Sequence, residues 1–109
     1  MAATLAVDTS GRIRMWSRQA EELLGYSEAE AMGRSIEIII PPHLRGRHSA
    51  GFARYVKTGI SNLPEVATSP AVHKSGDIFK VDISLVAVYE NQTIIAVQAM
   101  MRRSGQNRA

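Results

Sequence analysis

The spacing of hydrophobic residues along the chain changes near residue 60. Between residues 17 and 60 they recur mostly at helical intervals. Before residue 17 and after residue 60 they alternate with polar residues, as in strands. This order predicts an α+β fold, in which short helices and one long helix pack over one face of a five-stranded antiparallel sheet. The predicted strands span residues 4–8, 12–16, 62–71, 79–88 and 93–101, and the long helix spans residues 41–57.

The first two strands, 4–8 and 12–16, flank a turn-forming stretch and predict a β-hairpin. Strict alternation in the second strand predicts Ile13 and Met15 on one face of the sheet and Trp16 on the other. We therefore expect Trp16 to lie on the opposite side of the hairpin from Ile13.

Two short helices are predicted from their caps. Ser17 is a typical N-cap for the first helix, and Gly25 is a typical stop. Ser27, with Glu30 three residues later, forms the capping-box signature that starts the second helix. Residues 36–40 are apolar on nearly every side, so they predict a buried segment that is either a helical turn or extended.

The long helix begins with a proline pair, which suits a first helical turn. At about 100° per residue its main apolar side chains form one narrow stripe, with a histidine in the middle of it. This histidine is either a ligand of a bound group or a core residue hydrogen-bonded to a backbone carbonyl. We expect the stripe to face the odd-numbered side chains of strand 79–88. The stripe consists of Leu44, His48, Phe52 and Tyr55, and the opposing side chains are Phe79, Val81, Ile83, Leu85 and Ala87.

The last predicted strand carries apolar residues on both faces. Such a strand is either covered on both sides or presents its outer face to a partner. We therefore predict a homodimer through this face of the sheet, and the alternative is cover by an N-terminal helix outside this sequence. The predicted interface residues are Ile94, Ala96, Gln98 and Met100.

Composition narrows the range of functions. The 109 residues are enough for one hydrophobic core, so we expect one domain at residues 1–103, followed by a linker at 104–109. Cysteine is absent, which excludes disulfides, thiolate catalysis and cysteine-ligated metals. No catalytic triad, acid–base pair or phosphate-binding glycine loop is recognisable, so we do not expect an enzyme.

Charge and hydropathy bear on partners. The chain shows no secretory signal and no apolar run long enough to cross a bilayer, so we expect a cytoplasmic protein without a membrane partner. Its net charge is +3, but three arginines belong to a basic C-terminal stretch. Nucleic-acid binding is therefore not expected.

Several short motifs follow one another in a fixed order. They are Gly11, IRMWS at 13–17, AEELLGYS at 20–27, EAMG at 30–33, IIP at 39–41 and KSG at 74–76. Together they resemble a PAS domain of the S-box type over essentially the whole chain. The resemblance implies a small-molecule cavity between the long helix and the sheet. It also implies a sensory role in signal transduction beside an output domain, such as a histidine kinase or a transcriptional regulator of the bacterial type.

Within that family the chain is similar to the haem-binding PAS domains of FixL-type oxygen-sensing kinases, through RGRH at 45–48 and RY at 54–55. The resemblance implies that His48 is the axial ligand of the haem iron and that Arg54 contacts a propionate. The other residues expected around the cofactor are Leu44, Phe52 and Tyr55, with Ile83 and Leu85 on the distal side.

The sequence does not decide which ligand occupies the cavity. The distal arginine of those sensors aligns with Ala67 or Thr68, and their second propionate-side histidine aligns with Asn62. The candidates are haem b, another small molecule, or no ligand in a module that acts through protein contacts. Flavin is disfavoured, because the chain has few aromatic rings for stacking and no cysteine for an adduct.

Overall fold

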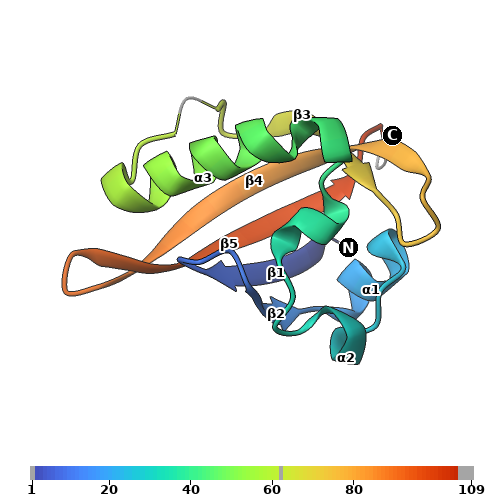
Figure 1. The fold of residues 1–109 in the computed structure, drawn as a ribbon, viewed down its shortest axis with the longest axis horizontal. Helices are drawn as coiled ribbons and strands as arrows, with labels where there is room; N and C mark the ends of the chain where they lie inside the picture. The colour runs from blue at the N-terminus through green and yellow to red at the C-terminus, as the bar shows by residue number, and fades with distance from the viewer. Residues whose placement is uncertain (1, 62, 106–109) are drawn as a thin grey trace.

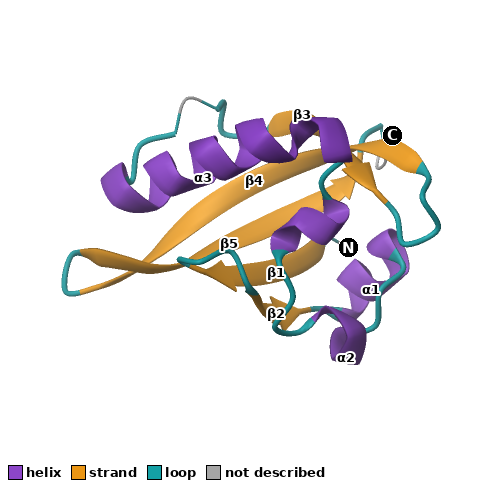
Figure 2. Ribbon diagram, in the orientation of Figure 1, coloured by secondary structure: helices purple, strands orange, loops and turns teal. Residues whose placement is uncertain are grey.

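The computed structural model describes residues 2–61 and 63–105. Its strands are β1 (Ala3–Asp8), β2 (Ile13–Trp16), β3 (Ala67–Val72), β4 (Ile78–Glu90) and β5 (Thr93–Arg103), and its helices are α1 (Arg18–Leu24), α2 (Glu28–Ala31), η1 (Ile36–Ile39), η2 (Pro42–Leu44) and α3 (Arg45–Thr58). The strands form one antiparallel sheet in the order β2-β1-β5-β4-β3. Figures 1 and 2 show α3 running along β4 and β5, with α1 and α2 beside β1 and β2. The predicted α+β architecture is confirmed.

The caps of the two short helices are as predicted. The Ser17 hydroxyl accepts a hydrogen bond from the amide of Ala20, and Gly25 ends α1 in the left-handed conformation. The Ser27 hydroxyl accepts from the Glu30 amide, while the Glu30 carboxylate accepts from the Ser27 amide. These reciprocal bonds satisfy amides that would otherwise lack a partner at the start of α2.

The long helix starts later than the sequence predicted. The proline pair opens a separate 3-10 turn, Pro42–Leu44, in which the Leu44 amide donates to the Pro41 carbonyl at 2.9 Å. The α-helix itself spans Arg45–Thr58 and ends at Gly59, whose φ of +73° favours glycine. None of the α3 side chains is fully buried, so this helix lies on the core and is not enclosed by it. The ambiguous segment before it forms the 3-10 turn η1.

The alternation predicted for β2 is wrong. Ala6 and Val7, which are successive residues of β1, pair with Met15 and Ile13. Arg14 between them has no partner and is the extra residue of a β-bulge. A bulge of this kind shifts all later side chains to the other face of the strand. Ile13 and Trp16 are consequently both buried in the core, whereas Met15 is exposed.

A second bulge corrects the predicted outer face of β5. The partner of Val88 is Ala96 and the partner of Tyr89 is Ile94, which leaves Ile95 as the extra residue. Ile94 therefore points to the core and is buried there, so its assignment to an outer interface is wrong. The outer face keeps the other three predicted residues, Ala96, Gln98 and Met100, and gains Ile95.

β3 is shorter than predicted and lies at the edge of the sheet. It begins at Ala67, after Pro64, and contains Pro70. A proline cannot donate to a neighbouring strand, which is tolerated on an edge strand. Asn62, with which the predicted strand began, lies outside the described residues.

The core forms between the sheet and the helices. Its largest fully buried side chains include Leu5, Ile13, Leu24 and Val81. As predicted, the odd-numbered side chains of β4 face this side: Val81 is buried, and the other four pack against the core while remaining partly accessible. This partial burial on both α3 and β4 leaves room between the two elements.

Candidate functional site

A cavity of about 430 Å³ opens between α3, the segment that follows it, and strands β3 and β4. This volume lies within the range typical of small-molecule sites. Six of the seven residues predicted around a cofactor line it: Leu44, His48, Phe52, Arg54, Tyr55 and Leu85. The seventh, Ile83, packs against the core cluster and is not part of the lining.

His48 is the most distinctive side chain of the cavity. Its ring stacks on Phe52, with the ring centroids 6.1 Å apart and the planes 17° from parallel. Burial lowers the pKa of His48 below its ordinary value, and the nearby Glu37 carboxylate opposes this shift. The ring is therefore neutral near pH 7, which is the form that binds metals.

The Nδ1 atom of His48 is buried and has no hydrogen-bond partner. This differs from a core histidine held by a carbonyl at that nitrogen, which was the alternative interpretation of the sequence. A buried polar atom without a partner costs about 1–3 kcal/mol. The ring in the cavity wall is thus neutral, and its buried nitrogen has no hydrogen-bond partner.

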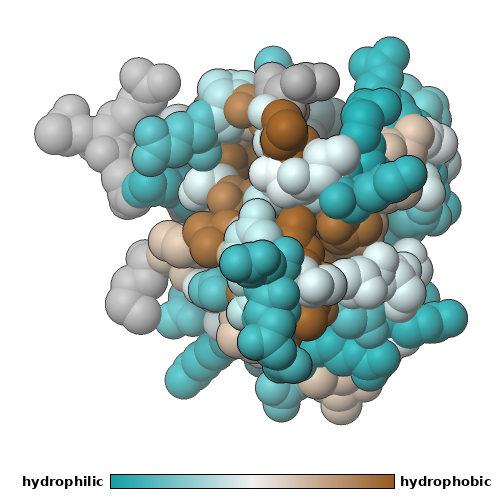
Figure 3. Space-filling view, turned by 90° about the vertical axis from the view of Figure 1, so that its left-hand side faces the viewer, coloured by the Kyte–Doolittle hydropathy of each residue, from teal (hydrophilic) through white to brown (hydrophobic). Residues whose placement is uncertain are grey.

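The mouth of the cavity combines cationic and aliphatic side chains. Arg47 and Arg54 line it from one flank of α3, and Ile60 and Leu63 line it from the following segment. Figure 3 views the end of the molecule at which α3 and the β4–β5 hairpin end, and it shows hydrophobic side chains gathered between hydrophilic ones. Apolar walls with cations at the opening suit a ligand that has an apolar body and a carboxylate.

Sequence reasoning found six of the lining residues. It missed Arg47, Ile60 and Leu63, and also Ile40, Gly51, Ser61, Ser69 and Pro70. The signal for Arg47 was available, because it lies seven residues before Arg54 and hence on the same helix flank. Ile60 and Leu63 follow the helix end at Gly59, and no periodicity extends past that residue.

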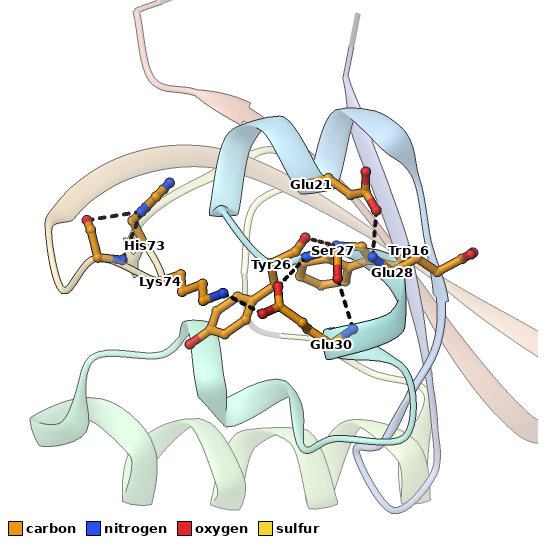
Figure 4. Close-up of polar contacts among 9 residues, drawn as sticks. Trp16, Glu21, Tyr26, Ser27, Glu28, Glu30, His73 and Lys74 are labelled. Atoms are coloured by element: carbon orange, nitrogen blue, oxygen red, sulfur yellow. Dashed lines mark hydrogen bonds and ion pairs between the residues drawn. The ribbon is translucent and has the colours of Figure 1, made fainter.

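A second polar cluster links α2 to the turn before β4 (Figure 4). The Lys74 ammonium pairs with the Glu30 carboxylate and lies 6.0 Å from the centre of the Tyr26 ring. The hydrogen bond from Lys74, followed by that from the Ser27 amide, lowers the pKa of Glu30 to about 2. The Trp16 indole donates to the Tyr26 carbonyl at 2.9 Å, which fixes the same corner. These contacts tie α2 and the end of α1 to the turn before β4.

Two features bear on other kinds of site. Across residues 2–61 and 63–105, no group of three or more histidine, aspartate or glutamate side chains is placed to hold a metal ion. In the same part of the chain, no helix is both long and apolar enough to cross a membrane.

Comparison with known proteins supports the class that this fold and cavity define. The family described as PAS fold matches residues 2–104. The chain belongs to the PAS fold family.

One curated relative is a sensor protein. The sensor protein FixL of Bradyrhizobium diazoefficiens is 39% identical over 56 residues, which cover 51% of this chain and 11% of FixL. The matched stretch thus spans about a tenth of that relative.

Two solved structures show the same fold. The PAS domain of a Colwellia psychrerythraea protein has a TM-score of 0.78 and 23% identity, over 94% of this chain and 85% of that one. The PAS domain of the Cronobacter turicensis RpfR quorum-sensing receptor, in complex with C12:0, has a TM-score of 0.77 and 16% identity, over 94% and 93% of the two chains. At these identities the likeness concerns the fold alone.

Proposed function

We propose that this chain is the non-catalytic sensory module of a longer signalling protein and that its cavity holds haem b with His48 as the axial ligand. The His48 ring carries the proposal, because it is neutral and lies in the lining of a largely apolar cavity. Neutral histidine is a common axial base for haem iron. The resemblance to FixL-type sensors supports the same residue, and the output would be an attached kinase or transcriptional regulator.

Four further lining residues have a defined part in this proposal. Phe52 and Leu85 would keep water away from the ring and present apolar surfaces to the macrocycle. Arg54 and Arg47 supply positive charge at the mouth for the propionate carboxylates. Bound haem would supply an iron that binds small gases or changes oxidation state, which gives the module a signal to read.

The test is reconstitution of the purified chain with haemin, followed by absorption spectroscopy. We expect a Soret band that shifts with carbon monoxide after reduction, is lost in His48→Ala, and returns when imidazole is added to His48→Gly. His43→Ala is the matched control, because His43 is exposed on the preceding turn and does not line the cavity. Equal, weak haemin binding by the wild type and His48→Ala would contradict the proposal.

A second candidate ligand is an acyl carboxylate. Arg47 and Arg54 at the mouth of an apolar cavity suit such a molecule without any metal, and the RpfR neighbour is described as a complex with C12:0. The discriminating probe is dodecanoate against dodecanol, measured by calorimetry. Binding of dodecanoate that weakens in Arg54→Ala and persists in His48→Ala would favour this candidate over haem.

The outer face of the sheet supports a proposal about assembly. Val86, Ile95 and Met100 are 54%, 44% and 44% exposed on the neighbouring strands β4 and β5. Burial of such a face against a second copy would remove apolar surface from water. We expect a dimer by light scattering and a monomer for Met100→Glu, with Lys57→Glu on α3 as the control. A strictly monomeric wild type at high concentration would contradict it.

A further inference from the structure

One segment of the chain carries basic residues without acidic ones. Residues 38–64 contain four lysines or arginines and no aspartate or glutamate, in a chain whose total net charge is +3. Arg47, Arg54 and Lys57 are exposed on α3. The two ion pairs found within residues 2–61 and 63–105 involve none of these three cations. None of these three cations has an ion-pair partner within the described residues, and the carboxylate noted above near the helix is that of Glu37, beside His48.

Aliphatic side chains project from the same segment. Ile60 and Leu63 line the mouth of the cavity, yet they are 72% and 55% exposed. Ile60 is the most exposed large hydrophobic residue described. A side chain that served only as a cavity wall would turn inward, whereas these two present most of their surface outward. Their exposure calls for something outside the domain that accepts aliphatic groups.

We propose that this side of the domain, the flank of α3 together with Ile60 and Leu63, docks on the surface of an anionic lipid bilayer. Protruding aliphatic groups flanked by cations are the combination that binds at a membrane interface. The bilayer accepts the aliphatic groups without a matching pocket, and its anionic headgroups attract Arg47, Arg54 and Lys57. Docking in this way places the mouth of the cavity against the bilayer. The sequence alone indicated no membrane partner, because it does not show that these residues meet on one surface.

The proposal is independent of which ligand fills the cavity, so its test uses the chain without haem or dodecanoate. The chain is sedimented with vesicles of phosphatidylcholine alone and of phosphatidylcholine mixed with phosphatidylglycerol. We expect binding to the anionic vesicles only, with an affinity that falls as salt is added. Reversal of two charges in Arg47→Glu with Arg54→Glu should weaken binding by at least about tenfold.

The matched controls lie on other surfaces. Lys80→Glu changes an exposed cation on β4, and Ile78→Ser removes an exposed aliphatic side chain at the start of that strand, so neither should alter binding. Ile60→Ser should weaken it several-fold. Ile60→Trp adds a reporter to the single buried Trp16, and its emission should shift to the blue on anionic vesicles.

Two results would overturn the proposal. One is equal sedimentation of the wild type and the Arg47→Glu, Arg54→Glu variant with anionic vesicles, including the case in which neither binds at low salt. The other is binding without an emission shift in Ile60→Trp, which would show that the aliphatic side chains stay outside the bilayer. Either result leaves the haemin experiment unaffected.

Discussion

At the scale of single residues, the β4–β5 turn contains a strained position. Asn91 and Gln92 both have positive φ, at 50° and 69°. Asparagine tolerates this conformation, whereas for a longer side chain it costs about 1–2 kcal/mol of stability. We expect Gln92→Gly to raise the free energy of unfolding by roughly 1 kcal/mol, as measured by urea denaturation. Asn91→Gly is the control and should change it by less; equal effects would show that Gln92 is not strained.

His48 should make stability depend on pH. Because the pKa of the folded form lies below the ordinary value of 6.5, the unfolded chain takes up a proton first as the pH falls. The contribution of His48 is therefore fully present above pH 6.5 and decreases below it. We expect the unfolding free energy to fall from pH 7 to pH 5 and His48→Gln to flatten that dependence. His43→Gln should leave it unchanged; an equally steep dependence without His48 would contradict the assignment.

The Glu30 carboxylate should titrate far below its usual range. Its pKa is about 2 because it accepts hydrogen bonds from Lys74 and from the Ser27 amide. The stability that these bonds provide is present above pH 4.5 and lost as the pH falls towards 2. In Lys74→Gln we expect the Glu30 pKa to rise towards its ordinary value, as followed by NMR of the side-chain carboxyl. Lys80→Gln should produce no shift.

At the scale of elements, the end of α3 closely approaches the β4–β5 hairpin at Gly59. A side chain at Gly59 would need a strained φ of +73°, and its Cβ would lie 2.7 Å from the Tyr89 hydroxyl. We expect Gly59→Ala to lower the unfolding free energy by about 2 kcal/mol, of which the conformation contributes about 1–2 kcal/mol. Tyr89→Phe in that background should restore part of the loss. If it restores none, the hydroxyl is not in the way.

The two bulges show which parts of the elements the sequence could not predict. Ser17 and Ser27 act through side chains that contact neighbouring amides, so their caps can be predicted from a few adjacent residues. Arg14 and Ile95 are extra residues only relative to a partner strand far away in the chain. The adjacent sequence gives no sign of either bulge. Each bulge moves the neighbouring side chains to the face of the sheet opposite the predicted one. Trp16 and Ile94 were therefore assigned to the wrong side.

The site follows the same division between local and distant information. His48, Phe52 and Tyr55 could be predicted because one helical period places them on a common stripe. Leu85 followed from strand alternation on the opposite wall. The unpartnered Nδ1 and the mouth at Ile60 depend on how α3 packs over the sheet, which no single stretch of sequence determines.

At the scale of the whole molecule, the fold could be predicted from the order of its elements and the PAS motifs, since five strands and their helices form one core. What the order could not predict is the distribution of charge around that core. The acid-free segment 38–64 becomes a surface only when α3 lies across the sheet with its cations outward.

The shallow seat of α3 has a consequence for how the domain opens. α3 contains no fully buried side chain, whereas Val97, Ala99 and Met101 of β5 are each at most 5% exposed. Segments with few buried contacts open locally without unfolding the rest. Amide hydrogens of residues 45–58 should exchange with deuterium faster than those of 97–101, and a cavity ligand should slow the first group alone. A ligand in this cavity would then act by lengthening the time for which α3 stays packed on the sheet.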